Sequence, residues 1–271
     1  MIRYLLICIF LFALFSGNAQ HRADSLFRAG DFGGAQLEYE RLVFEGKPPV
    51  SLWLLRKAYS QKAQQQYEHA LASLKRINLY EAPDSLTAKL FYETALLHYL
   101  NHQPDLALGV IQEWRYLHPA AFSSAGKVVE IFALAENQQW VEAKNAFDDW
   151  ARSYAADGWV NPLAGVEKVR WKKRRTAETL SFLLPGSGQW YAGSPGRGVV
   201  SAGLNGGAVL FAIHQFSNGF FFAGAYTGVG LFYLFYWGGA RYAVKLAELK
   251  NQRQQHELMQ ALHTAFRQKK E

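Results

Sequence analysis

An uncharged stretch of 43 residues, 198–240, constrains this chain more than any other feature, and Arg197 and Arg241 bracket it. As a single helix it would be about 65 Å long at 1.5 Å per residue, twice a hydrocarbon core of ~30 Å. One crossing of a bilayer is therefore too few, and two crossings joined by a tight turn fit. A buried soluble core is the competing interpretation, but the surface of a soluble domain normally carries charge.

The turn has one natural place, the polar cluster 214–219, because it ends in Asn218-Gly219 and Asn-Gly is a strong turn signal. The pattern predicts helices over residues 198–216 and 220–240. Each predicted helix carries glycines four residues apart, and small residues let helices approach closely in lipid, where the hydrophobic effect does not press them together. These helix-packing candidates are Gly203 and Gly207 in the first helix and Gly224 and Gly228 in the second.

Asn205 is the one amide in the body of the first predicted helix. We expect it to make an interhelical hydrogen bond, to Thr227 or Tyr226, because an amide in lipid needs a partner. A role in transport is the alternative.

A short motif leads into the uncharged stretch. Residues 176–184 are partly apolar and fit one or two helical turns, which end because Pro185 pushes the residue before it out of helical geometry. The glycines that follow allow turns or close backbone approach. The membrane-entry motif comprises Pro185, Gly186, Gly188, Gln189, Tyr191 and Gly193. No GxxxxGKS/T spacing is present, which disfavours a phosphate-binding loop.

Positive charge gathers in the same half of the chain. Residues 20–166 hold 14 Lys+Arg and 17 Asp+Glu, whereas residues 167–271 hold 14 and 5. A basic run just before the motif suits anionic lipid head groups. It consists of Lys172, Lys173, Arg174 and Arg175. We therefore expect contact with membrane lipid and not with nucleic acid.

The run 184–193, Leu-Pro-Gly-Ser-Gly-Gln-Trp-Tyr-Ala-Gly, is followed by a glycine-rich apolar pair and a basic exit. It resembles a bacterial two-helix membrane domain with a PGxGQxYxG-like entry, and the resemblance covers residues 172–252. The resemblance implies a two-helix membrane architecture and specifies no activity. Some related short helical membrane proteins are described as pore-forming, so a pore or transport accessory built from a homo-oligomer of helix pairs is the alternative function.

Residues 1–19 are typical of a secretory signal peptide, with Arg3, an apolar core over residues 4–15 and Gly-Asn-Ala at 17–19. An uncleaved anchor is the alternative. The only cysteine, Cys8, lies in this segment, so the mature chain is expected to hold no disulfide and no Cys-based zinc site. Export places the following residues in the periplasm. Both flanks of the predicted membrane pair are basic, against the positive-inside rule, so inner or outer membrane stays open.

Residues 20–155 contain a recurring pattern: an aromatic residue or Pro three residues before an Ala, and a large apolar residue four after it. The instances are Phe32-Ala35-Tyr39, Tyr67-Ala70-Leu74, Pro104-Ala107-Ile111 and Trp140-Ala143-Phe147. Successive alanines lie 35, 37 and 36 residues apart. Twelve residues before each of them lies a further small or apolar residue: Ala23, Ala58, Ala95 and Ile131.

This pattern resembles the tetratricopeptide (TPR) repeat, which has a period of about 34 residues and two helices per unit. Small residues let the two helices approach, and bulky ones fill the gap between neighbouring pairs. The resemblance implies a solenoid over residues 20–157 that binds a protein or peptide partner. An ordinary helical bundle is the alternative.

No constellation for catalysis stands out. His98 and His102, four apart on a predicted helix, come nearest to a metal site, but no HExxH arrangement is present. We find no Ser/His/Asp set and no paired carboxylates with a reason to be buried. We therefore expect no enzyme activity, no metal and no cofactor.

Together these features predict an all-α chain in five parts: a signal peptide at 1–19, the TPR-like solenoid at 20–157, a basic linker at 158–176, a transmembrane helical hairpin at 177–242 and a helical tail at 243–271. We expect a membrane-anchored scaffold or adaptor of the bacterial cell envelope, with its repeat domain in the periplasm.

Overall fold

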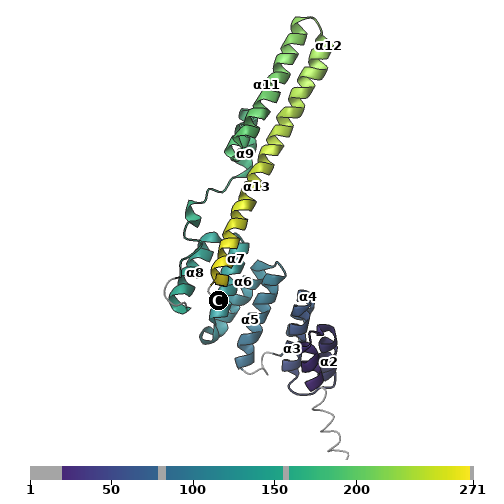
Figure 1. Ribbon diagram of the computed structural model, residues 1–271, viewed down its shortest axis with the longest axis vertical. Coiled ribbons are helices and arrows are strands. Elements are labelled where there is room, and N and C mark those ends of the chain that lie inside the picture. Colours follow the sequence, from purple (N-terminus) through teal and green to yellow (C-terminus); the bar gives the residue numbers. More distant parts are fainter. Residues whose placement is uncertain (1–19, 79–83, 155–158, 269–271) are drawn as a thin grey trace, which may run out of the picture. The chain divides into compact units, whose positions relative to one another are not determined.

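The computed structural model describes residues 20–78, 84–154 and 159–268. Every regular element in these residues is helical and none is a strand, which confirms the all-α prediction. The predicted signal peptide at 1–19 lies outside the described residues. The chain divides into two compact units, residues 1–161 (unit 1) and 162–271 (unit 2), and most of their helices are labelled in Figure 1.

Unit 1 consists of helices that pack in sequence order, each from α2 onward against the next. A helical segment at residues 20–28 comes before the others. They are α2 (Phe32–Phe44), α3 (Val50–Ala63), α4 (Tyr67–Lys75), α5 (Asp84–Leu100), α6 (Pro104–Leu117), α7 (Ser124–Glu136) and α8 (Trp140–Tyr154), with the 3-10 turn η2 (Pro119–Ala121) before α7. The helices α2, α4, α6 and α8 each begin at the aromatic residue or proline of the sequence pattern.

The same turn joins the two helices of each pair in unit 1. Five residues before each signature alanine the backbone is left-handed, with φ of 82°, 60°, 56° and 60° at Gly30, Gln65, His102 and Gln138. The amide of the next residue then donates to the carbonyl five residues back, as Asp31 does to Leu26 and Gln66 to Gln61. This is the hydrogen-bond pattern of a Schellman cap, which satisfies the last carbonyls of the first helix.

The core of unit 1 runs on from one helix pair to the next. Each of three hydrophobic clusters takes residues from one pair and from the first helix of the following pair. The first contains Ala23, Ala35 and Trp53, the second Ala58, Ala70 and Leu90, and the third Ala95, Ile111 and Val129. A helix pair has two apolar sides, so neighbouring pairs bury each other.

Unit 2 begins with the 3-10 turn η3 (Val166–Lys168) and then forms α9 (Arg174–Leu183), α10 (Ser187–Tyr191) and α11 (Pro195–Ser217). The chain turns back through α12 (Phe221–Ala223), continues as the π-helix η4 (Gly224–Val229) and ends in α13 (Gly230–Gln268). The turn falls at Asn218 and Gly219, within the predicted cluster, and Gly219 has a φ of 79°. Figure 1 shows α11 lying beside the returning helix, with which it is in contact.

Two helix boundaries differ from the predicted ones by three residues or more. α11 starts three residues earlier than residue 198, because Pro195 occupies its first turn, where its fixed φ favours helix initiation. The predicted boundary between membrane domain and tail, 242/243, falls inside α13, which continues without a break to Gln268. Residues 162–176 of the predicted linker belong to unit 2.

Candidate membrane-entry site and cavity

The membrane-entry motif forms a compact turn between α9 and α11. Leu184 is extended, with φ −144° and ψ 116°, as expected of a residue before proline. Gly186 and Gly193 have φ of 99° and 81°, the left-handed region where glycine has no Cβ to clash. The five-residue helix α10 lies between them, so both predicted turns are built on glycine.

Gly186 and Gly198 form a close helix crossing. A Cβ on Gly186 would overlap the carbonyl oxygen of Gly198, and a Cβ on Gly198 would overlap the indole ring of Trp190. The start of α10 therefore lies directly against α11. Gly198 carries no sequence signal for this role, because it depends on contact with a residue of another helix.

Gly188 marks the point where α9, α10 and α13 meet. A Cβ on this residue would overlap the carbonyl oxygen of Ala177 and the hydroxyl of Ser181, and would lie 2.9 Å from the Cβ of Ala243. Alanines on α9 and α13 complete this contact, since Ala177 and Ala243 are fully buried. Only a residue without a side chain fits at this position.

Gln189 connects the membrane-entry motif to α13 through a hydrogen bond. Its side chain is fully buried, and its Nε2 donates to the carbonyl oxygen of Gly239 at 2.9 Å. Its Oε1 has no hydrogen-bond partner among the described residues. A Cβ on Gly239 would lie 2.9 Å from Ser201 Oγ, so α10, α11 and α13 converge here.

Tyr191 anchors the basic run. Its hydroxyl accepts a hydrogen bond from the backbone amide of Lys173 at 3.0 Å, and Lys172 Nζ lies 4.7 Å from its ring centroid. Asn251 on α13 holds the same segment through two bonds of 2.8 Å to the backbone of Lys172. Arg174 pairs with Glu248 at 2.8 Å. Two of the four predicted head-group contacts thus have protein partners, and lipid contact by the run stays a prediction.

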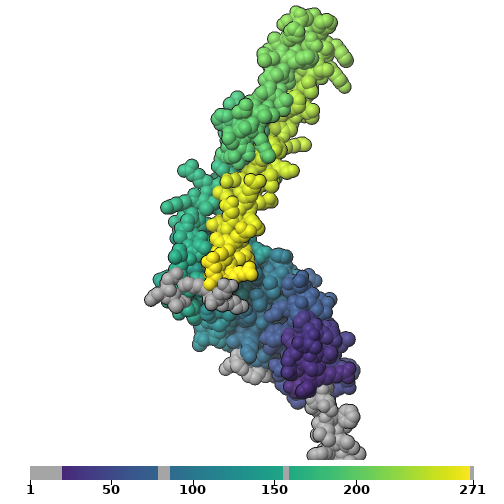
Figure 2. All heavy atoms as spheres, in the orientation of Figure 1, coloured from purple at the N-terminus to yellow at the C-terminus, as the bar shows by residue number. Residues whose placement is uncertain are grey.

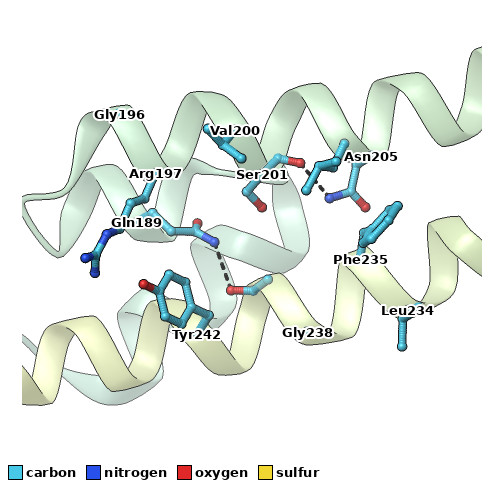
Figure 3. Close-up of a pocket in the computed structure, with 12 residues that line it drawn as sticks. Gln189, Gly196, Arg197, Val200, Ser201, Asn205, Leu234, Phe235, Gly238 and Tyr242 are labelled. Carbon is cyan, nitrogen blue, oxygen red and sulfur yellow. Dashed lines mark hydrogen bonds between the residues drawn. The ribbon is translucent and has the colours of Figure 1, made fainter.

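A cavity of about 580 Å³ opens between α11 and α13 beside the motif. Figure 3 shows Gln189, Ser201 and Asn205 reaching into the space between the two helices, with Arg197 and Tyr242 at one end. Leu204, Leu234 and Phe235 form part of the apolar wall. The sequence signal for this cavity is the four-residue spacing of Arg197, Ser201 and Asn205, which puts three polar side chains on one helix face.

Of the predicted packing glycines, Gly224 and Gly228 on the returning helix make close contacts, whereas Gly203 and Gly207 on α11 do not. A Cβ on Gly228 would lie 2.5 Å from the Cβ of Ala212, and one on Gly224 would lie 3.2 Å from the ring of Phe216. Gly203 and Gly207 face outward with open space around them, so their predicted packing within the chain is wrong. On α11 the buried face is formed instead by Gly198, Asn205, Ala208 and Ala212.

The predicted interhelical hydrogen bond of Asn205 is also wrong. Asn205 Nδ2 donates to the carbonyl oxygen of Ser201 on its own helix at 2.8 Å. Thr227 likewise bonds within its own helix, to the carbonyl oxygen of Ala223. Asn205 is 3% exposed, and its Oδ1 has no partner among the described residues.

Large apolar side chains cover the outside of the helix pair. Leu210 is 69% exposed and Phe222 is 83% exposed, and Val199, Ile213, Phe221, Tyr226 and Leu234 are exposed as well. Figure 2 shows the side chains of this segment, in green and yellow-green, projecting outward. Within the described residues, α11 is the one helix long and apolar enough to cross a bilayer by itself.

In unit 1 the signature alanines Ala35, Ala70, Ala107 and Ala143 are all fully buried. A pocket of about 470 Å³ lies between α4, α5 and α6. Its wall is mostly apolar, including Leu71, Phe91 and Val110, and Lys75, His98 and Glu113 supply charged or polar groups. The sequence did not reveal this pocket, because its residues come from three helices with no shared spacing.

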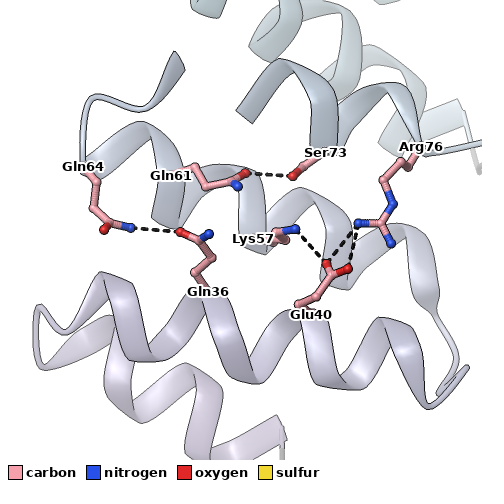
Figure 4. A network of polar contacts seen from close by, with 7 residues as sticks. All are labelled: Gln36, Glu40, Lys57, Gln61, Gln64, Ser73 and Arg76. Carbon is pink, nitrogen blue, oxygen red and sulfur yellow. Dashed lines mark hydrogen bonds and ion pairs between the residues drawn. The ribbon is translucent and has the colours of Figure 1, made fainter. Parts of the chain in front are cut away.

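A polar network crosses the first helices of unit 1 (Figure 4). Glu40 on α2 accepts from Lys57 Nζ at 2.7 Å and from Arg76 Nη1 at 2.9 Å. Burial raises the pKa of the Glu40 carboxyl, but these hydrogen bonds outweigh it and hold the pKa below its ordinary value. Ser73 donates to the buried Gln61 at 2.8 Å in the same region.

His98 and His102 each contact a different partner. His98 Nδ1 lies 2.9 Å from Gln103 Oε1, and His102 Nδ1 lies 3.0 Å from Glu136 Oε1. His102 stands in the left-handed turn after α5, so the two rings do not share a helix face.

Comparisons of the chain with protein-family models, with curated proteins and with solved structures found no match.

Proposed function

We propose that the chain is a membrane-anchored adaptor of the bacterial cell envelope, in which unit 2 sits in lipid as a helical hairpin and unit 1 is a TPR-like solenoid that binds a protein or peptide segment. The observation that carries the proposal is the contrast between the two units. Unit 2 exposes an uncharged apolar surface over residues 198–240, whereas unit 1 has a buried apolar core between its helix pairs and exposes fewer large apolar side chains, among them Phe44 and Tyr116. In water the first surface would be an aggregation hazard, and in lipid it is favourable.

Three features support the solenoid part of the proposal. The helix pairs repeat every 35 to 37 residues, each pair has the same left-handed turn, and the core continues from pair to pair. Stacked pairs of this kind offer extended surfaces to peptide segments. The pocket between α4, α5 and α6 has room for one large apolar side chain of such a segment. The proposal puts unit 1 in the periplasm, because the predicted signal peptide would export it.

A photo-crosslinking residue at Lys75, on the rim of this pocket, tests the adaptor role in cells that make the full chain. We expect a discrete adduct in the membrane fraction, lost when Leu71→Lys places a charge in the pocket. The matched control carries the crosslinker at Glu142, which is exposed on α8 and does not line the pocket. Identical adducts at both positions, or none at Lys75, would overturn the adaptor role.

A second candidate function is a small pore or transport accessory formed by several copies. Gly203 and Gly207 favour it, because they leave a face of small residues on α11 uncovered within the chain. This function predicts ion flux through liposomes that contain the purified chain alone. The adaptor predicts tight liposomes together with partner capture in cells.

A further inference from the structure

We infer that the pocket between α4, α5 and α6 receives a tryptophan or tyrosine side chain of the partner segment, and that this residue lies between an acidic and a basic residue of the partner. This inference rests on the proposed binding of a protein or peptide segment by unit 1, and it names the chemistry of that segment.

One face of α5 forms the long side of the pocket. Leu90, Thr94 and His98 line it at four-residue spacing, so they follow a single helix face over about 12 Å of rise. The helices α4 and α6 both pack against α5, and they contribute Leu71 and Val110 to the lining. A mostly apolar pocket of about 470 Å³ with this length suits a flat aromatic ring.

His98 supplies the pocket with a hydrogen-bond acceptor. Its Nδ1 lies 2.9 Å from Gln103 Oε1, which is itself an acceptor, so Nδ1 carries the ring proton and Nε2 keeps its lone pair. Among residues 20–78, 84–154 and 159–268, no group donates to this Nε2, and the atom is not fully buried. A ligand can therefore reach it.

This acceptor distinguishes between aromatic side chains. The N–H of tryptophan and the O–H of tyrosine donate hydrogen bonds, whereas phenylalanine has no donor. His98 lies one helical turn, about 6 Å of rise, beyond Thr94. A ring that packs at the level of Thr94 can therefore direct its polar edge at His98 while its faces stay against the apolar lining.

Two charged side chains flank the aromatic site from different helices. Lys75 on α4 and Glu113 on α6 line the pocket and are exposed, and neither has an ion pair among the described residues. The next residue on α4, Arg76, is by contrast already paired with Glu40. A segment with one acidic and one basic residue around its aromatic residue complements both charges, whereas a segment with two like charges is repelled by one of them.

Fluorescence anisotropy of short fluorescein-labelled peptides with the detergent-solubilised full chain tests the inference. The peptides share one acidic and one basic flank and differ at the central residue, which is tryptophan or naphthylalanine, a side chain of similar shape without the N–H. We expect the tryptophan peptide to bind about fivefold more tightly. Equal binding of the two peptides would overturn the inference.

His98→Phe assigns this preference to the proposed acceptor. The variant is expected to bind the tryptophan peptide no more tightly than the naphthylalanine peptide, and to bind the latter as the unaltered chain does. The matched control is His69→Phe, because His69 is exposed on α4 and does not line the pocket. A preference for tryptophan that survives in His98→Phe, with the thermal transition intact, would overturn the inference.

Charge reversal tests the flanks with exposed residues that the fold does not depend on. Lys75→Glu is expected to shift the preference about fivefold toward a tryptophan peptide with two basic flanks, and Glu113→Lys toward one with two acidic flanks. Glu68→Lys is the control, since Glu68 is exposed on α4 and does not line the pocket. An unchanged preference in both reversal variants would overturn the inference.

The crosslinking experiment at Lys75 separates failure of this inference from failure of the proposed function. A chain that forms the adduct in cells but binds these peptides equally, or not at all, is an adaptor whose pocket recognises other chemistry. A chain that gives neither an adduct nor peptide binding refutes the adaptor role itself.

Discussion

Single residues without a side chain hold unit 2 together. Gly188 fills a place where Ala177, Ser181 and Ala243 leave no volume for a Cβ, and Gly198 does the same beneath Trp190. Helix contacts in lipid depend on such close approach, because the apolar surroundings are as favourable for a leucine as the helix interface. The motif Pro185–Gly193 therefore lets the helices of unit 2 pack closely, and its glycines have distinct geometric roles.

Gly188→Ala should destabilise unit 2 by about 1–3 kcal/mol, because the added methyl group forces α9 and α13 apart. Gly203→Ala is the matched control, since its Cβ would meet nothing within 4 Å and alanine favours the helix. Thermal unfolding of the detergent-solubilised chain would measure both. Equal transition temperatures for the two variants would contradict the close crossing.

The ion pairs of Glu40 with Lys57 and Arg76 make the stability of unit 1 sensitive to acid. Its pKa is lowered in the folded state, so its contribution to stability is present above the unfolded pKa and is lost as the pH falls through the folded one. Glu40→Gln should cost about 1 kcal/mol or less at neutral pH, because the side chain is 39% exposed and solvent screens the pairs. That cost should shrink as the pH falls from the unfolded pKa through the lower folded one, so it should be smaller at about pH 3 than at neutral pH.

Thermal melts at the two pH values, combined with a double-mutant cycle with Arg76→Gln, would measure the Glu40 contact. A loss of stability that is the same at both pH values would show that the carboxylate charge is not involved.

At the scale of the helices, the sequence predicted element type and position better than contacts. The repeat pattern located the starts of α2, α4, α6 and α8, because a residue at a helix start and a buried alanine three positions on are both local properties. The direction in which Gly203 and Gly207 face could not be predicted from such local properties. Glycines four apart share a helix face, but which face meets a neighbour depends on Gly198, Ala208 and Ala212 on the other side.

The length of α13 was missed for a related reason. The composition changes at Arg241 from apolar residues to a charged tail. Such a change does not by itself end a helix. No glycine, proline or capping residue stops the helix there, and Ala240, Ala243 and Leu246 continue one buried face across the predicted boundary. The cavity was missed because Gln189 and Gly239 are 50 residues apart in the sequence.

The repeated left-handed turn leads to a prediction about helix pairs. Gln65 pays the steric cost of a φ of 60°, a conformation that glycine adopts freely. Gln65→Gly should stabilise unit 1 by about 1 kcal/mol. Ala63→Gly, two residues earlier in right-handed helix, should instead destabilise it by up to about 1 kcal/mol. Chemical denaturation would measure both, and changes of the same sign would contradict the turn.

Across the whole molecule, the two units suit different solvents. Unit 1 has charged side chains outside and alanines between its helices, as a water-exposed stack requires. The helix pair of unit 2 places large apolar side chains outside and two amide side chains, Gln189 and Asn205, inside. The basic run and Arg241 stand at the same end of the helix pair, because the chain turns back at Asn218. We propose that residues 198–240 cross the bilayer twice.

Single-cysteine labelling tests this claim most directly, because Cys8 is the only cysteine in the chain and can be replaced by serine. A membrane-impermeant maleimide would be applied to intact cells carrying one cysteine at Arg175, Leu210, Asn218 or Lys250. We predict that Arg175 and Lys250 label from one side, Asn218 only from the other, and Leu210 from neither, although its side chain is 69% exposed. If Leu210 and Asn218 were labelled from the same side as Arg175 and at the same rate, residues 198–240 would not cross the bilayer.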